Sequence, residues 1–420
     1  MNFENRIAYL DWLQAKKNKM KKRIFIAMQY LEIGGAERSL VEMLNTIDYR
    51  KCDIDLFIYC HHGELMDSIP KEVNLLPESK PYSALARPIR VILKEGHILI
   101  AIARLWAKWR SSQFEKKRKV KDSITIFQYV ANYTTPLLPS LKGMGRYDLA
   151  ISYLIPHNIV RDKVDAKRKW AWIHTDYSYV GINEENEYPV WSAFDRIAAV
   201  SSDVADSFIG KFPMLERKVF VFENILSESS IREKAKITKD ETNLSLMSNY
   251  KGVKLCSVGR FSYPKAFDRA VEICYYLVTS GIDCRWFVIG YGSDEQLIRA
   301  AIKEWGMEEH FIILGKKNNP YPYINACDIY VQPSRYEGKS VTVREAQILC
   351  KPVVITAYAT AKSQVNNGND GIIVPNEAKD AAKGLANLIQ DIPLRNHIIS
   401  FLKTHHYGNE KEINKLYSDD

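Results

Sequence analysis

Twelve short apolar runs, separated by glycine or polar breaks and by helical patterns, constrain the fold of this chain more than any other feature. In the first half they are 23–28, 53–59, 148–154, 169–174, 196–202 and 218–225, and in the second half 253–259, 284–292, 311–315, 328–334, 352–357 and 371–375. Near-continuous apolar strands separated by helices are typical of parallel sheets covered on both faces. The pattern predicts an α/β protein with two doubly wound, Rossmann-like domains.

The length and composition agree with two domains. A chain of 420 residues with 46% hydrophobic residues can fill two cores. Residues 227–250 are polar and almost free of aromatic residues, which is typical of a linker. We therefore predict an N-terminal extension over 1–21, a first domain over 22–226, a linker over 227–250, a second domain over 251–392 and a helical C-terminal segment over 393–420.

Cysteine usage and hydropathy indicate where the protein works. The seven cysteines are odd in number and contain no CxxC pair, so neither a disulfide framework nor a metal site is predicted. The N-terminus lacks the apolar core and cleavage site of a secretory signal. The apolar stretch 98–109 is broken by Arg104 and Lys108, short of the roughly 18 to 20 residues that span a bilayer. The sequence predicts a cytoplasmic protein whose membrane contact is peripheral.

Basic residues gather between positions 87 and 121. This segment holds eleven Lys or Arg against only two Glu, with apolar and aromatic residues interleaved in its first half. Such a stretch is attracted to an anionic membrane or to a nucleic acid. On a membrane, the apolar groups would enter the interface while Arg104, Lys108 and Arg110 stay at the headgroups. A solvated helix face is the simpler alternative.

The first candidate binding motif is "MQYLEIGGAERSL", which follows the run 23–28. In open α/β sheets, ligands bind outside the carboxyl ends of the strands, where helix N-termini present free N–H groups. Gly34 and Gly35 would let a ligand approach the backbone closely. Ordinary turn chemistry is the alternative. The G-x-G-x-x-G fingerprint is absent, which counts against an NAD enzyme.

The second motif is "VGRFSYPKAFDRAVEI", residues 258–273, again at the end of an apolar run. Arg260 and Lys265 lie on a turn that enters a helix. Arginine offers a planar fork, lysine a point charge, and the helix terminus its own N–H donors, so together they form a candidate diphosphate clamp. Two exposed surface cations are the alternative.

The third motif is "RYEGKSVTVRE", residues 335–345, after the run 328–334. We expect a helix from about residue 341 with Ser340 as its N-cap. Glu337 lies at the loop entrance and Glu345 one turn into the helix. A carboxylate accepts hydrogen bonds from vicinal hydroxyls, so one can hold a sugar and the other a ribose. The loop between them, whose N–H groups can hold a phosphate or hydroxyl, consists of Gly338, Lys339 and Ser340. Two exposed glutamates are the alternative.

These motifs together resemble retaining GT-B glycosyltransferases of the family 4 type. The resemblance runs from about residue 22 to 380 and includes "GGAER", "VGRFSYPKAFDRA", "VIGYGSDEQL" and "EGKSVTVRE". It implies that the second domain binds a nucleotide-activated sugar, that the first binds the acceptor, and that the reaction takes place between them. It also implies that Arg260 and Lys265 stabilise the leaving diphosphate, that Glu337 holds the donor sugar and that Glu345 holds the ribose.

The resemblance extends to one histidine and fails at two glycines. "WIHTD" places His174 where the family has a histidine facing the donor sugar, and a structural histidine is the alternative. Ala266 and Cys350 stand where the family usually has glycine. The family reaction retains the anomeric configuration without a metal, so the implied small molecules are a UDP- or GDP-sugar donor and no separate cofactor.

The stretch 357–375 resembles bacterial enzymes that build capsular polysaccharides and exopolysaccharides on lipid-linked acceptors at the inner face of the cytoplasmic membrane. We therefore expect segment 87–121 to bind an anionic membrane and not a nucleic acid, and the acceptor to be a lipid-linked glycan or an oligosaccharide. Two other classes stay open: a GT-B-fold sugar-nucleotide epimerase, and a non-catalytic basic binding protein. No feature predicts an oligomeric state.

Overall fold

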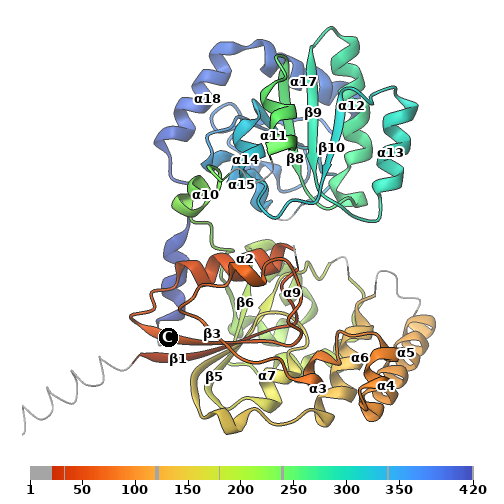
Figure 1. Ribbon diagram of the computed structural model, residues 1–420, viewed down its shortest axis with the longest axis vertical. Helices are drawn as coiled ribbons and strands as arrows, with labels where there is room; N and C mark the ends of the chain where they lie inside the picture. The colour runs from red at the N-terminus through yellow and green to blue at the C-terminus, as the bar shows by residue number, and fades with distance from the viewer. Residues whose placement is uncertain are drawn as a thin grey trace, which may run out of the picture. The chain divides into compact units, whose positions relative to one another are not determined.

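The computed structural model describes residues 21–32, 34–118, 123–178, 180–237, 241–337 and 340–418. Two predicted site residues, Gly338 and Lys339, lie outside these ranges, as does the end of the basic segment. The chain forms two compact units (Figure 1). Unit 1 comprises Met1–Ile225 and Lys411–Asp420, and unit 2 comprises Leu226–Glu410.

The sheet of unit 1 has the strand order β3-β2-β1-β4-β5-β6-β7, and its strands pair in parallel. The strands are β1 (Lys22–Met28), β2 (Cys52–Ile58), β3 (Asn74–Leu75), β4 (Tyr147–Ser152), β5 (Ala166–Ile173), β6 (Arg196–Ala199) and β7 (Val219–Val221). All except β3 lie within or over a predicted run. Because β3 has only two residues, the sequence contains no apolar run that predicts it.

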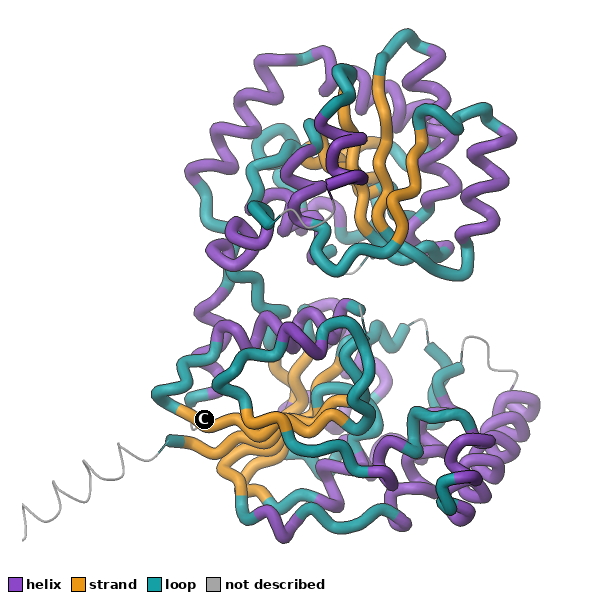
Figure 2. The backbone as a smooth tube through the Cα atoms, viewed as in Figure 1, coloured by secondary structure: helices purple, strands orange, loops and turns teal. Residues whose placement is uncertain are grey.

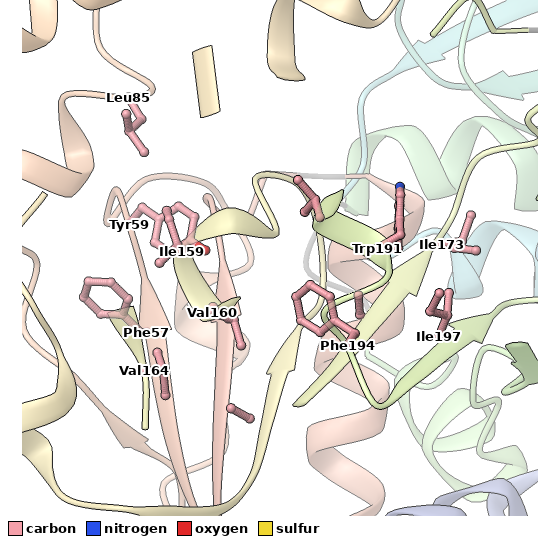
Figure 3. Close-up of a cluster of buried hydrophobic side chains, with 14 of the residues drawn as sticks. Phe57, Tyr59, Leu85, Ile159, Val160, Val164, Ile173, Trp191, Phe194 and Ile197 are labelled. Carbon is pink, nitrogen blue, oxygen red and sulfur yellow. The ribbon is translucent and has the colours of Figure 1, made fainter. Parts of the chain in front are cut away.

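Helices cover both faces of this sheet (Figure 2). They are α2 (Gly35–Thr46), α3 (Lys80–Ser83), α4 (Ile89–Lys94), α5 (Ile98–Arg118), α6 (Thr125–Thr134), α7 (Asn158–Lys163), α8 (Glu184–Trp191) and α9 (Ser202–Lys211). Along β1, Ile24 and Ile26 pack in the cluster that contains Leu40 of α2, whereas Phe25 packs in the cluster that contains Ile159 of α7. Figure 3 shows part of the latter cluster, between β2, β6 and the helices. Burial of both faces explains the continuous apolar runs.

The sheet of unit 2 has the order β10-β9-β8-β11-β12-β13, also with parallel pairing. Its strands are β8 (Val253–Val258), β9 (Cys284–Ile289), β10 (Phe311–Gly315), β11 (Ile329–Gln332), β12 (Val353–Thr356) and β13 (Ile372–Val374). Each coincides with a predicted run. The two sheets confirm the predicted pair of doubly wound α/β domains.

The helices of unit 2 are α10 (Glu228–Lys234), α11 (Glu241–Ser248), α12 (Phe267–Thr279), α13 (Glu295–Glu304), α14 (Tyr321–Ala326), α15 (Val341–Ile348), α16 (Ala361–Gln364), α17 (Ala378–Gln390) and α18 (Ile392–Thr404). One core cluster joins Leu255 of β8 to α12 and α17, and the other joins Cys256 to α14 and α15. Leu255 and Cys256 point to opposite faces of β8, so helices also cover both faces of this sheet.

Two segments differ from the predicted organisation. Residues 227–250, expected as a linker, include α10 and α11, which bury Ile231 and Met247 in the core of unit 2. The C-terminal segment also divides between the units: Ile398 of α18 packs in unit 2, whereas Ile413 and Leu416 pack in unit 1. In both cases a few apolar residues within a polar stretch are enough to fix the segment on a core.

Candidate active site

The predicted donor motifs converge at the centre of the unit 2 sheet. β8 and β11 are neighbours, and the chain continues from β8 outward to β9 and β10 on one side and from β11 to β12 and β13 on the other. Such a reversal of strand order leaves a crevice at the carboxyl ends of the two strands. The loop 259–266 leaves β8 there, and the loop 333–340 leaves β11.

An ion pair joins these two loops. Lys265 Nζ lies 2.5 Å from Glu337 Oε1, and both side chains are mostly buried, with 24% and 11% exposed. The same oxygen accepts hydrogen bonds from Ser334 Oγ at 2.6 Å and from Gln332 Nε2 at 3.2 Å. Three donors on one oxygen fix the orientation of the carboxylate. Among the described residues all of its donors contact Oε1, so Oε2 is the oxygen placed to accept a ligand hydroxyl.

Two arginines that the sequence analysis did not single out tie the loops together. Arg335 donates to both carboxylate oxygens of Asp268 at 2.9 and 2.6 Å and to the Tyr263 carbonyl at 2.8 Å. Burial raises the pKa of Asp268, but the hydrogen bond and the charge of Arg335, together with backbone hydrogen bonds, outweigh burial and lower the pKa. Arg269 donates to the Pro333 carbonyl at 2.7 Å. Pairs this distant in sequence carry no local pattern that would have revealed them.

Glu345 lies on α15, which begins at the predicted position after Ser340. It is buried, with 3% exposed, and its Oε1 accepts a hydrogen bond from Tyr321 OH at 2.8 Å. Gln364 brackets the start of the helix, accepting from Ser340 N at 3.1 Å and donating to Ser340 O at 2.5 Å. A buried glutamate at a helix start is costly unless it has partners, so its position argues for a binding role over an exposed decoration.

Arg260 is exposed, in contrast to Lys265. Within the described ranges, no ion pair or side-chain hydrogen bond from its guanidinium is found. The structure thus brings Lys265 and Glu337 into contact and leaves Arg260 beside them, on the loop after β8.

The two departures from the glycine pattern share one conformation. Ala266 and Cys350 both have φ of +56°, in the left-handed region that glycine adopts without steric cost. Ala266 is the N-cap of α12. Cys350 follows α15 in a Schellman motif, with Cys350 N bonded to Gln347 O and Lys351 N to Ala346 O. The fold therefore retains the backbone geometry at both positions despite the side chains.

The glycines of the first motif lie in unit 1. Gly34 is the N-cap of α2, and a Cβ added there would be 2.1 Å from Glu37 Oε2, so the absent side chain makes room for that carboxylate. An added Cβ at Gly35 would meet nothing within 4 Å. A carboxylate already beside a helix N-terminus would have to move before an anionic ligand bound there.

His174 follows β5 in unit 1. Its Nε2 lies 2.9 Å from the Tyr153 carbonyl, and burial lowers its pKa to about 4, so the ring is neutral at pH 7. Because a carbonyl only accepts, Nε2 must carry the proton, which makes Nδ1 an acceptor. In this tautomer Nδ1 can accept a hydrogen bond from a hydroxyl group but cannot donate a hydrogen bond.

Helix α5, in the basic segment, exposes an apolar face. We call Ile98, Leu99, Ile102, Leu105, Trp106 and Trp109 the α5 apolar face; each is 49 to 67% exposed. Their spacing of three or four residues places them on one side of the helix.

The expectation for Arg104 is wrong, because its Nη1 donates to the carbonyls of Ala84 and Arg87 at 2.7 and 2.5 Å and ties α5 to the preceding segment. None of the described helices is long and apolar enough to cross a bilayer.

The chain is similar to several known proteins over part or nearly all of its length. Residues 239–404 match the family model of glycosyl transferases group 1. The Campylobacter jejuni protein named N-acetylgalactosamine-N,N'-diacetylbacillosaminyl-diphospho-undecaprenol 4-alpha-N-acetylgalactosaminyltransferase is 24% identical over 203 residues, 48% of this chain and 52% of that protein. The capsular polysaccharide biosynthesis glycosyltransferase CapM of Staphylococcus aureus is 28% identical over 163 residues, 38% of this chain and 41% of its own length. The chain spans about half the length, or less, of these relatives.

Solved structures match nearly the whole chain. HepE of Anabaena, in complex with UDP and glucose, superposes with a TM-score of 0.63 at 14% identity, covering 94% of this chain and 98% of that one. TarM of S. aureus superposes with a TM-score of 0.60 at 12% identity, covering 94% and 97%. The chain therefore has the two-domain GT-B fold, and residues 239–404 of its second unit are similar to the group 1 glycosyl transferases.

Proposed function

We propose that this protein is a retaining glycosyltransferase of the family 4 type that moves a hexose-like sugar from a nucleoside diphosphate to a glycan acceptor in cell-surface polysaccharide synthesis. The observation that carries the proposal is the contact between Lys265 and Glu337 at the strand reversal of unit 2, with Glu345 buried on the helix that follows. This arrangement offers a cation for a diphosphate and carboxylates for hydroxyls at one end of one sheet. The group 1 match over the same residues supports it.

The proposed reaction uses these groups in order along the donor. Glu345 holds the ribose, Lys265 and Arg260 face the diphosphate with the N-terminus of α12, and Glu337 holds the transferred sugar. Negative charge grows on the departing phosphate in the transition state, so fixed cations stabilise it more there than in the bound substrate. We propose that the departing phosphate takes up the acceptor proton, that no metal is needed, and that EDTA leaves the rate unchanged.

For the donor we propose a UDP- or GDP-sugar, with UDP favoured. The HepE structures hold UDP, UDP with glucose, or UDP-glucose, and share the fold of this chain. No other cofactor is part of the proposal.

For the acceptor we propose a lipid-linked glycan, reached by a peripheral protein at the inner face of the cytoplasmic membrane. The printed name of the C. jejuni relative includes a diphospho-undecaprenol acceptor, and CapM is named for capsule synthesis. The α5 apolar face supplies groups that can enter a membrane interface, and Lys108, Arg110, Lys116, Lys117 and Arg118 on the same helix are exposed cations that attract anionic headgroups.

The proposal is tested by transfer assays with nucleotide sugars and acceptor membranes. Lys265→Ala and Arg260→Ala should each lower the turnover rate by about 10² to 10³, because each removes a donor from a preorganised anion site. The melting temperature should stay unchanged for the exposed Arg260 and should fall for Lys265, whose loss leaves the Glu337 carboxylate without its cation. Lys303→Ala, an exposed lysine at the end of α13, is the matched control and should transfer like the wild type. Near-wild-type turnover in both site variants would refute the diphosphate assignment.

The same assay separates the two other classes. A sugar-nucleotide epimerase would change the donor without acceptor membranes, and a non-catalytic binding protein would leave it intact in their presence. Transfer that requires both donor and acceptor, with retained anomeric configuration in the product, is the result that we expect.

A further inference from the structure

Unit 1 contains a pocket whose lining includes neither of the two glycines nor His174. It lies where α6, the loop after β4 and α8 meet, and measures about 400 Å³ including its open mouth. The space enclosed within it is well below the roughly 300 to 1,000 Å³ of sites for drug-sized ligands, so it admits no more than a single ring, which must enter from the open mouth. α6 packs along α5, and Figure 1 shows the two helices side by side at one edge of the unit. The pocket and the α5 apolar face therefore belong to neighbouring helices of the unit.

Aromatic side chains form part of the pocket wall. Trp191 is almost fully buried, and its orientation is fixed because Nε1 donates to Glu187 Oε2 at 2.9 Å and its ring lies 4.4 Å from the His157 ring. Phe127 is 52% exposed and also lines the pocket. Rigid aromatic surfaces bind the apolar faces of a ligand at little cost in conformational entropy.

Amide groups supply the polar part of the wall. Gln128 Oε1 accepts from Asn183 N at 3.1 Å, and Gln128 Nε2 is buried without an acceptor in the described part of the chain. Asn132 Oδ1 accepts from Asn158 Nδ2 at 2.9 Å, which leaves the Asn132 amide nitrogen as a donor. A buried donor without an acceptor is unfavourable, and a hydroxyl or carbonyl oxygen of a ligand would satisfy it.

The charge of the pocket selects between classes of ligand. No lysine or arginine occurs among its described lining residues, whose titratable members are His157 and Glu187. Burial lowers the pKa of His157 to about 3 and raises that of Glu187 to about 7. The pocket therefore carries no positive charge at neutral pH and disfavours phosphates and other anions.

We propose that this pocket, the α6–α8 pocket, binds a neutral pyranose ring of the acceptor, with the ring against Phe127 and Trp191 and its oxygens accepting from Gln128 and Asn132. The inference rests on the proposed function, because an acceptor exists only if the protein transfers sugars. It adds the chemical class of the group recognised and the residues that recognise it. A lipid chain would leave the amides unsatisfied, and a sugar phosphate would find no cation.

Binding is measured without activity, by ligand-observed NMR with the methyl glycosides of glucose, galactose, N-acetylglucosamine and N-acetylgalactosamine, and with glucose 6-phosphate and inorganic phosphate as anionic probes. Gln128→Met keeps the side-chain length and removes the donor, and Asn132→Ala removes the second amide. The matched controls are Gln296→Met on the exposed face of α13 and Asn45→Ala near the end of α2. Melting temperatures show whether each variant is folded.

We expect at least one glycoside to bind the wild type, and each pocket variant to weaken it about tenfold, the value of one hydrogen bond. The controls should bind like the wild type, and nucleotide binding should be unchanged throughout. Failure of every glycoside to bind, equal binding by the folded pocket variants, or tighter binding of glucose 6-phosphate would overturn the inference. If the wild type transfers sugar and the pocket variants transfer it at the same rate, the inference is overturned while the proposed function stands.

Discussion

Ala266 and Cys350 show that a backbone position can keep its conformation after losing the residue that suits it. A non-glycine residue in the left-handed region costs about 1 kcal/mol or more. The resemblance to a family that usually has glycine there marked both positions, but only the φ of +56° at each gives the physical reason.

Replacement of Cys350 by glycine should therefore stabilise unit 2. Release of the strain exceeds the extra chain entropy of glycine, so we expect a gain of up to about 1 kcal/mol and a rise of about 2 to 4 °C in melting temperature. Cys350→Ala keeps the strain and is the control, expected to give no gain. Ala266→Gly should be near neutral, because a fully buried methyl group is lost as the strain is released. A destabilised Cys350→Gly variant would contradict this account.

Glu187 gives unit 1 a predictable pH dependence. Burial raises its pKa to about 7 from 4.5, against the hydrogen bonds from Trp191 and Tyr177. Between these values the folded state holds a proton that the unfolded state releases, so a rise in pH through this window lowers the stability, by up to about 3 kcal/mol. Glu187→Gln should melt higher than the wild type at pH 8 and equally at pH 5. The exposed Glu185→Gln serves as control, and an unchanged melting difference across this pH range would contradict the prediction.

The candidate site could be predicted only in part at this scale. Lys265, Glu337 and Glu345 follow apolar runs in short motifs, so strand ends and residue chemistry were enough to select them. Arg335, Arg269 and Gln364 act through partners far away in the sequence, and a single sequence does not encode which side chains meet. Gly338 and Lys339 lie outside the described residues, so their roles stay predictions.

Among the elements, the strands were predicted best and the surface of α5 least. Twelve of the thirteen described strands coincide with apolar runs in the sequence, because most of them are buried on both faces. For α5, composition revealed the charge but not the orientation. In the structure the apolar side chains are exposed, and Arg104 donates a hydrogen bond to the Ala84 carbonyl. The charge pattern alone had predicted that Arg104 would face the lipid headgroups.

The α5 apolar face and the basic end of α5 should contribute separately to membrane binding. Replacing Lys116, Lys117 and Arg118 by glutamine should weaken sedimentation with anionic vesicles by about 1 kcal/mol per charge, and less at high salt. The control removes the same charge elsewhere, at the exposed residues Lys211, Arg217 and Lys251.

Trp106→Ser with Trp109→Ser should weaken binding to anionic and neutral vesicles alike, because the rings are half exposed and lose apolar contact with either lipid. Neither set should change nucleotide binding. Full sedimentation of both sets at moderate salt would exclude α5 as the anchor.

For the whole molecule, the periodic runs predicted two doubly wound units, whereas the places where the chain passes between units depended on a few residues. The last described residues return to unit 1, where Lys415 donates to the Val221 carbonyl and Leu416 is fully buried. No composition change marks that return. The proposed function treats each unit separately: we propose a donor site at the strand reversal of unit 2 and an acceptor pocket in unit 1.

The most direct test of the donor site is calorimetry with a nucleoside diphosphate and its sugar conjugate, chosen as the UDP, GDP or ADP pair that most raises the wild-type melting temperature. Glu345→Gln should weaken both ligands, because the ribose is common to them. Glu337→Gln should leave the nucleoside diphosphate bound as in the wild type and weaken only the sugar conjugate. Equal losses for both ligands in both variants, or no binding of any nucleotide to the wild type, would contradict the central claim that these loops hold a nucleotide sugar.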